Sequence, residues 1–578
     1  MSPSSPAGNG RPAANGRATR KRTGGEIVCD VLLEEGSTVV FGMPGGASLP
    51  FYDALYHYQD RIRHVLCRHE QGAGFAANGW ARATGKAGVA TSTSGPGATN
   101  LVTCMANDMM DSVPVVYITG QVSRPAIGSD AFQETDITGI TIPITKHNYL
   151  VLDVNELPRV MKEAFYLATT GRPGPVHVDI PKDVFLASTD APTPASIELR
   201  GYRPAKAGHA LAVRRAAEAI NAAERPIIMA GHGIVISGAA SELLQLAEKA
   251  RIPVITTLHG VGTFPESHAL SYGMLGMHGM AYANYALAHT DCVIGLGVRF
   301  DDRATGKVEE FAKAAKIVHI DIDPAEIGKV LKTDFPIVGD LKLTLRDLIP
   351  HVETRERTAW HAQMEQWRAD HPSLRIPDSP DSVLPQETVR MIYEISRGAA
   401  RVVADVGQNQ MWAAQHYWYE RPREFFSAGG LGPMGYALPA AMGVQIADPT
   451  RKVWCITGDG GVLINVQEFN TLAAERIPVK VAILNNAHLG MIRQWQEFFY
   501  GGRLMGAHLD NPDFAKVAEA FGLRGISART RDEMHDAIAA AYAYDGPVVL
   551  DLHVDRVESV YPMVVPGTPI GAVVEDPR

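Results

Sequence analysis

Two short polar segments could together hold a metal ion and a diphosphate. The first is Gly458-Asp459-Gly460-Gly461, and the second is Asn485-Asn486, at the end of the next apolar run. Mg²⁺ prefers carboxylates, neutral oxygens, water and ligand phosphates, and glycines let a backbone approach an anion closely. A Gly-Asp-Gly turn alone is common. With the asparagine pair it favours a metal-held diphosphate, with Asp459 and Asn486 as ligands and the glycines Gly458, Gly460 and Gly461 beside the phosphates.

The expected elements around these segments place them at one edge of a sheet. Residues 452–457 and 479–484 form apolar runs typical of strands, and a helical stretch lies between them at about 466–475. Together they predict one β-α-β unit. Ligands of such units bind beyond the carboxyl ends of the strands, which is where both polar segments lie.

A second candidate for chemistry is Glu70, within Arg68-His69-Glu70-Gln71-Gly72-Ala73-Gly74. This segment follows an apolar run and opens a helix of small residues expected over 75–84. A lone glutamate at the start of a helix is usually only a cap. A catalytic carboxylate is the alternative, and the residues alone leave both open.

Size and charge bound the remaining possibilities. The 578 residues exceed what one hydrophobic core supports, which predicts about three domains. A net charge of −9 argues against nucleic acid or anionic membranes as partners. No apolar run approaches the roughly 18 residues of a membrane span, and the N-terminus lacks the apolar segment of a secretory signal. The five cysteines lie far apart without a C-x-x-C pair, which favours a reducing cytoplasm over disulfides or zinc.

The alternation of β-branched runs with helical stretches predicts three α/β domains, each a doubly wound parallel sheet. We expect them at 23-190, 209-350 and 383-560, separated by Pro-rich connections. Residues 1-22 are rich in Ser, Pro, Gly and Asn, carry basic but no acidic residues, and predict a disordered tail. An organelle transit peptide is the alternative, although the tail is short and shows no amphipathic period. The strand candidates of the first two domains are 37–41, 87–93, 113–119, 176–180, 227–230, 253–256, 292–296 and 316–320.

Nearly the whole chain, from about 24 to 564, resembles the catalytic large subunits of the acetolactate synthase (acetohydroxyacid synthase) family, which are thiamine-diphosphate-dependent enzymes. The motifs that carry the resemblance are 41–47, 69–74, 130–136, 172–175, 179–183, 275–279, 299–303, 407–412 and 490–496. The likeness implies a pyrimidine-binding domain, a central FAD-binding Rossmann-like domain and a diphosphate-binding domain. It also implies the cofactors thiamine diphosphate, Mg²⁺ and FAD.

The reaction implied by the resemblance joins two 2-oxoacids. Pyruvate loses CO₂, and its hydroxyethyl group is transferred to pyruvate, giving 2-acetolactate, or to 2-oxobutyrate, giving 2-aceto-2-hydroxybutyrate. These products lead to valine, leucine and isoleucine. The cofactor supplies the difficult chemistry, and the protein orients it and excludes water. FAD has no net redox task in this reaction.

Residue roles carry over by position in the matching motifs. Glu70 is expected to share a proton with N1′ of the aminopyrimidine ring, and the carbonyl of His488 to complete the metal shell. Further catalytic residues are Gln133, Lys182 and Met411, and the substrate pocket is Phe132, Arg303 and Trp495. Further cofactor contacts are Gly46, Gln408 and Met434, with Arg172, His278, Arg299, Asp321 and Asp340 toward FAD. From the residues alone, the turn at 230–233 is only a weak nucleotide signal.

The resemblance also implies an assembly. Glu70 would come from one subunit and the diphosphate site from another, in a homodimer or homotetramer that pairs with a separate regulatory small subunit. The alternatives in this fold are a 2-oxoacid decarboxylase, a pyruvate oxidase and a glyoxylate carboligase. A silent metabolite-binding protein is the alternative from another class. Arg303 favours carboligation, because a second 2-oxoacid brings its own carboxylate, and Glu70 argues against a glyoxylate carboligase.

Overall fold

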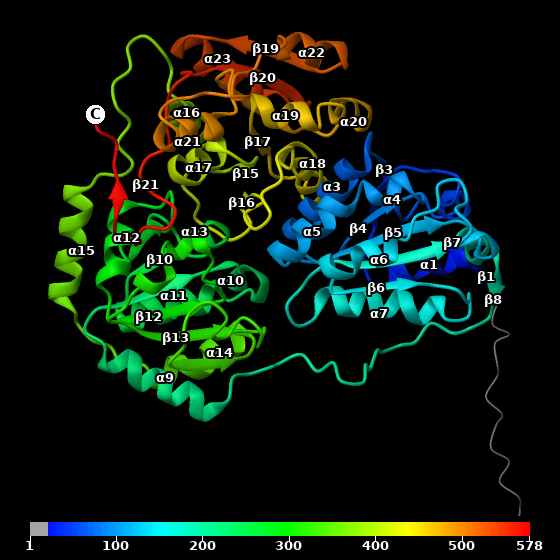
Figure 1. The fold of residues 1–578 in the computed structure, drawn as a ribbon, viewed down its shortest axis with the longest axis horizontal. Coiled ribbons are helices and arrows are strands. Elements are labelled where there is room, and N and C mark those ends of the chain that lie inside the picture. Colours follow the sequence, from blue (N-terminus) through cyan, green and yellow to red (C-terminus); the bar gives the residue numbers. More distant parts are fainter. Residues whose placement is uncertain (1–20) are drawn as a thin grey trace, which may run out of the picture.

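A computed structural model describes residues 21–578 of the chain, so nearly all of the predicted tail at 1-22 lies outside the described residues. The described chain forms three lobes, each built on a six-stranded parallel sheet with helices on both faces (Figure 1). This confirms the predicted fold class of three doubly wound α/β units. None of the helices between residues 21 and 578 is long and apolar enough to cross a membrane.

The first domain has the strand order β3-β2-β4-β5-β7-β6. Its inner strands are buried on both faces, as parallel strands covered by crossover helices must be. The strands are β2 (Val39–Gly42), β3 (Arg63–Leu66), β4 (Gly88–Ser92), β5 (Val115–Gln121), β6 (His147–Leu150) and β7 (Val176–Pro181). The helices are α1 (Gly24–Glu34), α2 (Leu49–Tyr56), α3 (Glu70–Thr84), α4 (Pro96–Thr99), α5 (Val102–Asp111), α6 (Ile137–Thr141), α7 (Leu157–Thr169) and α8 (Lys182–Leu186).

The central domain has the order β11-β10-β9-β12-β13-β14, the 3-2-1-4-5-6 order of dinucleotide-binding sheets. Its strands are β9 (Pro226–Ala230), β10 (Val254–Thr256), β11 (Ser271–Met274), β12 (Cys292–Leu296), β13 (Lys316–Asp321) and β14 (Phe335–Val338). Its helices are α9 (Ala210–Ala222), α10 (His232–Ser237), α11 (Ala240–Ala250), α12 (Ala281–His289), α13 (Asp302–Thr305), α14 (Leu341–Leu348) and α15 (Thr358–Asp370).

The third domain has the order β16-β15-β17-β18-β20-β19. Numbered within each domain, the first and third sheets share one topology, 2-1-3-4-6-5, although their sequences show no obvious repeat. The strands are β15 (Arg401–Ala404), β16 (Phe425–Phe426), β17 (Val453–Gly458), β18 (Lys480–Asn485), β19 (Arg524–Ala528) and β20 (Val548–His553). The helices are α16 (Pro385–Ser396), α17 (Gln408–His416), α18 (Ala437–Ala447), α19 (Asp459–Ile464), α20 (Glu468–Glu475), α21 (Gly490–Phe499), α22 (Phe514–Ala520) and α23 (Arg531–Ala543).

The first and third domains pack together through α3 and α18, which lie side by side in Figure 1. The contact depends on glycine. A Cβ added at Gly79 would lie 2.1 Å from the carbonyl oxygen of Ala440, and one at Gly443 would lie 1.9 Å from that of Ala76. The two backbones therefore touch only because these side chains are absent.

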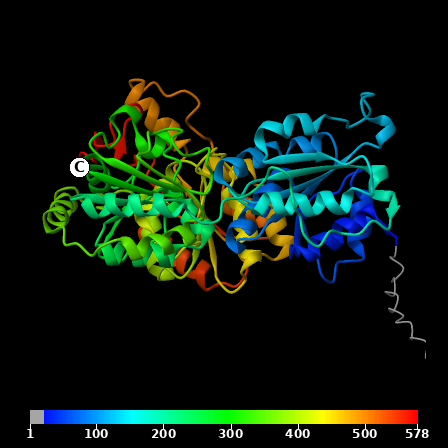
Figure 2. The same cartoon turned by 90° about the horizontal axis from the view of Figure 1, so that it is seen from below.

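Short pairings and a long connection complete the chain. Strand β1 (Arg22–Thr23) pairs with β8 (Ser188–Thr189), and β21 (Met563–Val564) pairs with β22 (Val573–Val574) near the C-terminus. Between β8 and α9 the chain runs without regular structure along the outside of the molecule (Figures 1 and 2). All five cysteines are buried and none forms a disulfide.

Candidate functional site

The predicted diphosphate segments meet at one edge of the third sheet. Strands β17 and β18 are parallel neighbours, with Gly458 paired to Leu484. Their carboxyl ends therefore bring Asp459 beside the asparagine pair. The Nδ2 of Asn511 connects the two segments, because it donates to Oδ2 of Asp459 at 2.7 Å and to Oδ1 of Asn485 at 3.0 Å.

Asp459 is a buried acid without a cationic partner among the described residues. Its Oδ1 accepts the N–H of Gly460 at 2.9 Å, and burial raises the pKa of its carboxyl. The Oδ1 of Asn511 is buried beside it with no hydrogen-bond partner in the described chain. A buried carboxylate is costly unless a positive charge compensates it. The site therefore fits a cation.

The donor set suits Mg²⁺ rather than a protein-caged metal. Within residues 21–578 no cluster of three or more His, Cys, Asp or Glu side chains could hold a metal ion. Mg²⁺ needs only one or two carboxylates when amide oxygens, water and phosphates complete its shell. The Oδ1 of Asn486 accepts the N–H of His488 at 3.0 Å, so these two predicted ligands lie together.

Close packing at the diphosphate edge requires glycine at two positions. A Cβ at Gly460 would meet Leu489 Cδ2 at 2.5 Å, and one at Gly461 would meet Asp405 Oδ2 at 2.6 Å. Gln408 begins α17 beside this edge, and its Oε1 lies 3.4 Å from Nδ2 of Asn486. The predicted contact Met434 lies close by, with its Cε 3.5 Å from the Cβ position of Gly460.

Glu70 lies in the first domain, as the first residue of α3. Its side chain is buried, and its Oε2 accepts a hydrogen bond from Nδ2 of Asn100 at 2.9 Å. A Cβ at Gly97 would come within 3.2 Å of its Oε1, so the glycine loop after β4 lies against the carboxylate. The Nδ1 of His69 caps the helix by accepting the N–H of Gln71, so the Glu70 carboxylate does not serve as the helix cap.

The other predicted first-domain residues also follow the carboxyl ends of its strands. Gly46 comes after β2, and a Cβ there would meet nothing within 4 Å. Gln133 adopts a left-handed backbone conformation (φ 60°), and its carbonyl oxygen lies against Gly95 in the glycine loop. Phe132 is 88% exposed. Lys182 begins α8 immediately after β7.

A cavity of about 700 Å³ lies where the three domains meet. The predicted residues Met411, Arg303 and Trp495, expected at the reacting centre and the acceptor pocket, line this cavity. The predicted FAD contacts line it too, namely Arg172, His278, Arg299, Asp321 and Asp340. The guanidinium of Arg303 lies 5.8 Å from the Trp495 ring centroid, and its Nη1 is 3.3 Å from Sδ of Met277. The volume is within the range of small-molecule and cofactor pockets.

Charged groups along this cavity are held by specific partners. Arg172 donates to Oγ of Ser112 at 2.8 Å and to Oε1 of Glu326 at 2.6 Å, which joins the first and central domains. Burial lowers the pKa of His278 to about 4, so its ring is neutral at pH 7. Burial raises the pKa of Asp321 to about 6.

The structure thus brings the predicted residues together as two groups rather than one. Helix α17 connects the diphosphate edge to the cavity, because Gln408 faces Asn486 and Met411 lines the cavity. None of the first-domain set, Gly46, Glu70, Phe132, Gln133 and Lys182, lines this cavity. Within one chain, the first-domain set therefore stays outside the cavity.

Comparison with known proteins gives the same three-part organisation. Models of the thiamine pyrophosphate enzymes match residues 22–140 as the N-terminal TPP-binding domain, 213–348 as the central domain and 405–552 as the C-terminal TPP-binding domain. The acetolactate synthase of Mycobacterium bovis is 49% identical over 95% of this chain and 91% of its own length. The chain belongs to the acetolactate synthase family.

Two further acetolactate synthase relatives cover nearly the whole chain. The large subunit of Corynebacterium glutamicum is 46% identical over 98% of this chain and 91% of its own length. A probable large subunit of Methanocaldococcus jannaschii is 47% identical over 96% of this chain and 95% of its own length. The likeness to acetolactate synthases therefore spans all three domains.

Several residues of this acetolactate synthase site escaped the sequence analysis. Asn511, which bonds Asp459, lies in an irregular loop after α21. Asn100, which donates to Glu70, lies a few residues after the glycine loop. Only this nearness to the loop could have indicated from the sequence that Asn100 belongs to the site. The Oδ1 of Asp405 accepts a hydrogen bond from the N–H of Gly435, the residue after Met434, at 3.0 Å.

Proposed function

We propose that this protein is an acetolactate synthase catalytic subunit that joins two 2-oxoacids. It decarboxylates pyruvate and transfers the hydroxyethyl group to pyruvate, giving 2-acetolactate, or to 2-oxobutyrate, giving 2-aceto-2-hydroxybutyrate. Family membership over the whole chain supports the reaction class. The observation that carries carboligation is the pairing of Arg303 with Trp495 in a cavity that Met411 also lines.

The third domain is proposed to bind thiamine diphosphate through Mg²⁺. The Asp459 carboxylate, the Asn486 amide oxygen and the His488 carbonyl would hold the ion, and the backbone at Gly458, Gly460 and Gly461 would meet the phosphates. When bound, thiamine diphosphate supplies the electron sink that lets a 2-oxoacid lose CO₂. Gln408 and Met434 lie beside this edge, and Met411 would support the rings of the cofactor.

The first domain is proposed to supply the proton chemistry. Glu70 would hold a proton at N1′ of the aminopyrimidine ring, and its burial keeps water from that proton. Asn100 fixes the carboxylate by donating to Oε2. Gly46, Gln133 and Lys182 would complete this side of the site.

The acceptor pocket is proposed to recognise a second carboxylate. The planar guanidinium of Arg303 can bond both oxygens of a carboxylate at once. Trp495 would bound the pocket, with Phe132 closing it from the first-domain side. A simple decarboxylase or a pyruvate oxidase has no second 2-oxoacid to hold, so this cation favours the synthase over those alternatives.

A shared site between subunits is proposed because the first-domain residues do not line the cavity of their own chain. The first-domain surface exposes large apolar side chains, including Phe132 (88%) and Leu186 (60%), and the third domain exposes Met505 (84%). Such surfaces favour association. We therefore propose a homodimer or homotetramer in which Glu70 of one subunit meets Asp459 of another.

FAD is proposed to occupy the cavity between the domains. The strand order of the central sheet and the position of Asp321 at the end of β13 suit a dinucleotide. Arg172, His278, Arg299 and Asp340 line the same space. The fully buried, unpaired thiols support a reducing cytoplasm, and the family likeness supports a separate regulatory small subunit as a partner.

The deciding experiment identifies the product. Purified protein is incubated with pyruvate, thiamine diphosphate, Mg²⁺ and FAD, and the products are followed by NMR. We expect 2-acetolactate, and a mixed product when 2-oxobutyrate is added. Acetaldehyde alone would indicate a decarboxylase, and acetyl phosphate or acetate with reduced flavin would indicate an oxidase. Either result would overturn the proposed function.

A further inference from the structure

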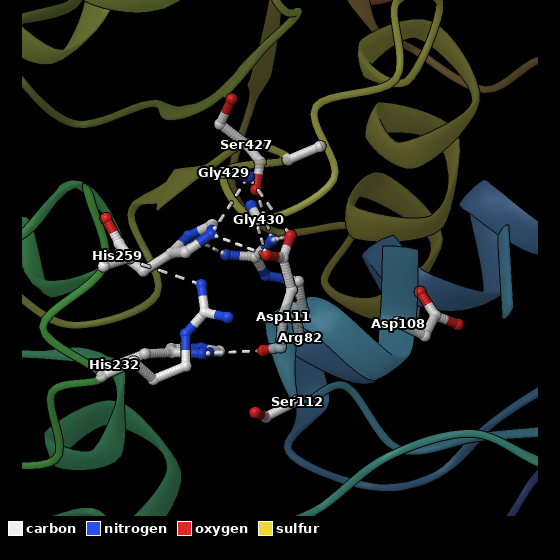
Figure 3. A network of polar contacts seen from close by, with 12 residues as sticks. Arg82, Asp108, Asp111, Ser112, His232, His259, Ser427, Gly429 and Gly430 are labelled. Atoms are coloured by element: carbon white, nitrogen blue, oxygen red, sulfur yellow. Dashed lines mark hydrogen bonds and ion pairs between the residues drawn. The ribbon is translucent and has the colours of Figure 1, made fainter. Parts of the chain in front are cut away.

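A buried polar network joins all three domains beside the cavity (Figure 3). Its centre is Asp111, the last residue of α5, whose side chain is fully buried. Arg82 comes from α3 of the same domain, and His259 comes from the central domain, in the turn Leu258–Gly260. The segment Gly429-Gly430 follows β16 in the third domain. None of the predicted catalytic or metal-binding residues belongs to this network.

Asp111 binds the third-domain segment through both of its oxygens. The N–H of Gly430 donates to Oδ1 at 2.8 Å, and the N–H of Gly429 donates to Oδ2 at 3.3 Å. A carboxylate at the C-terminal end of a helix opposes the helix dipole. Burial alone would raise the pKa of Asp111, but the contact with His259 and the charge of Arg82 outweigh burial and lower it. Asp111 is therefore an ionised acceptor.

His259 lies between Arg82, Asp111 and Gly429. Its Nδ1 accepts a hydrogen bond from Nη2 of Arg82 at 3.0 Å, because a guanidinium can only donate. Its Nε2 lies 3.1 Å from Oδ1 of Asp111 and also 3.1 Å from the backbone nitrogen of Gly429. His259 therefore connects Arg82 both to Asp111 and to the third-domain segment.

The same end of α5 also fixes two parts of the cavity wall. The Nδ1 of His232 lies 3.1 Å from the carbonyl oxygen of Asp111. Burial lowers the pKa of His232 well below its usual value, so the neutral ring donates to that carbonyl. The next residue, Ser112, accepts a hydrogen bond from Arg172 at 2.8 Å. Asp111, His232, His259, Gly429 and Gly430 all line the cavity.

We propose that Asp111 and His259 are positioning residues for the flavin. They hold Gly429-Gly430 against the turn at His232, so that walls from different domains form one rigid surface of the cavity. This inference rests on the proposed placement of FAD there. Without the network the third-domain segment loses its buried acceptors, and flavin binding then has to order that segment again.

The test uses Asp111→Asn with Asp108→Asn as its matched control. Asp108 lies one turn earlier on α5 and points away from the network (Figure 3). It bonds Asn78 and Tyr117 of its own domain, and burial raises its pKa to about 8, so an amide mimics its protonated form. Amide hydrogen exchange over 427–432 is measured in flavin-free protein, and the dissociation constant of FAD by quenching of flavin fluorescence.

Asp111→Asn is expected to speed amide exchange at Gly429 and Gly430 and to weaken FAD binding, each by about tenfold. Asp108→Asn is expected to match wild type in both. Equal exchange and equal FAD affinity in the two variants would overturn the proposal. A wild type that binds no FAD would overturn the flavin assignment and the positioning role with it. FAD binding that is unchanged in Asp111→Asn would overturn the positioning role alone.

A second pair of variants keeps the proposal testable if Asp111→Asn fails to fold. His259→Gln keeps a polar amide near the place of Nε2 that can bond Asp111 or Gly429, whereas His259→Leu removes every polar atom of the side chain. We expect His259→Gln to keep the wild-type FAD affinity and the absorbance spectrum of bound flavin, and His259→Leu to lose about tenfold in affinity. If both variants lose affinity equally, the polar contacts of His259 with Asp111 and Gly429 are not the reason and the proposal is wrong.

Discussion

The carboxylate of Glu468 accepts a hydrogen bond from the backbone N–H of His69, at 3.1 Å. The same oxygen, Oε1, also accepts the N–H of Arg68 at 2.9 Å. Glu468 begins α20 in the third domain, and His69 immediately precedes Glu70 in the first. The third domain of a chain therefore fixes the point at which the helix bearing Glu70 begins.

This contact predicts a pH dependence of stability. Burial raises the pKa of Glu468 to about 7, whereas an unfolded glutamate titrates near ~4.3. Between these values the folded state holds a proton that the unfolded chain has lost, so stability falls as pH rises. Glu468→Gln removes this titration. From about pH 5 to 7, the free energy of unfolding of wild type should fall by up to ~3 kcal/mol relative to that of the variant. The melting temperature of wild type should therefore fall relative to that of Glu468→Gln.

The control for that experiment is Glu475→Gln, at the other end of α20, where the side chain pairs with Arg63 at the surface. Its melting temperature should follow the wild-type pH profile. Parallel profiles for wild type and Glu468→Gln would show that Glu468 does not hold its proton in the folded protein.

The metal edge predicts a graded loss of cofactor affinity. Asp459→Asn removes the negative charge of the proposed metal ligand, and titration calorimetry should show Mg²⁺-dependent binding of thiamine diphosphate weakened by about a hundredfold. Asn511→Ala removes only the side chain that orients Asp459, so the affinity for thiamine diphosphate should fall by about tenfold. Affinity that is unchanged in Asp459→Asn would exclude Asp459 as a ligand.

A shared site predicts rescue between two inactive variants. Glu70→Gln should fold normally but lose at least about a hundredfold in turnover, because an amide cannot exchange the proton at N1′. Asp459→Asn should be inactive for lack of cofactor. When the two are mixed and refolded or coexpressed, half of the dimers are mixed and each has one intact site, so about a quarter of wild-type turnover should return. If each chain builds its own site, no activity returns.

The acceptor pocket predicts a change of product rather than a simple loss. Arg303→Leu removes the cation for the second carboxylate while leaving the decarboxylation residues in place. We expect acetaldehyde to replace most of the acetolactate, with KM for the acceptor raised by about tenfold or more. Arg303→Lys keeps the positive charge without the bidentate geometry, so its product ratio and KM should lie between those of wild type and Arg303→Leu. An unchanged product ratio by NMR would place the acceptor elsewhere.

The sequence predicted the interior of the first two sheets and missed their edges. The eight strands expected from apolar runs are the four inner strands of each sheet, among them β5 and β12. The four missed strands, β3, β6, β11 and β14, are all at edges. Inner strands are buried on both faces and read as continuous apolar runs. The edge strands β3 and β6 begin with the exposed polar residues Arg63 and His147, and Gly273 and Pro336 interrupt β11 and β14, so the apolar pattern breaks.

The same reasoning separates the site residues that a sequence can predict from those that it cannot. Asp459 and the asparagine pair follow consecutive inner strands of one unit, so strand order alone places them together. Glu468 acts on His69 and Asp111 acts on Gly430 across domain boundaries, between segments hundreds of residues apart. Only the packing of domains brings such pairs into contact, and no local pattern encodes that packing.

The five buried cysteines make the native protein inert to thiol reagents. Burial raises the pKa of every one of them, so none is a ready thiolate. Cys29 lies in a core of the first domain and Cys292 in a core of the central domain, whereas Cys67, Cys104 and Cys455 share one core between the first and third domains. Alkylation rates followed cysteine by cysteine in mass spectrometry would therefore time the opening of each of these cores. A cysteine introduced at the surface could carry a fluorescent label without background.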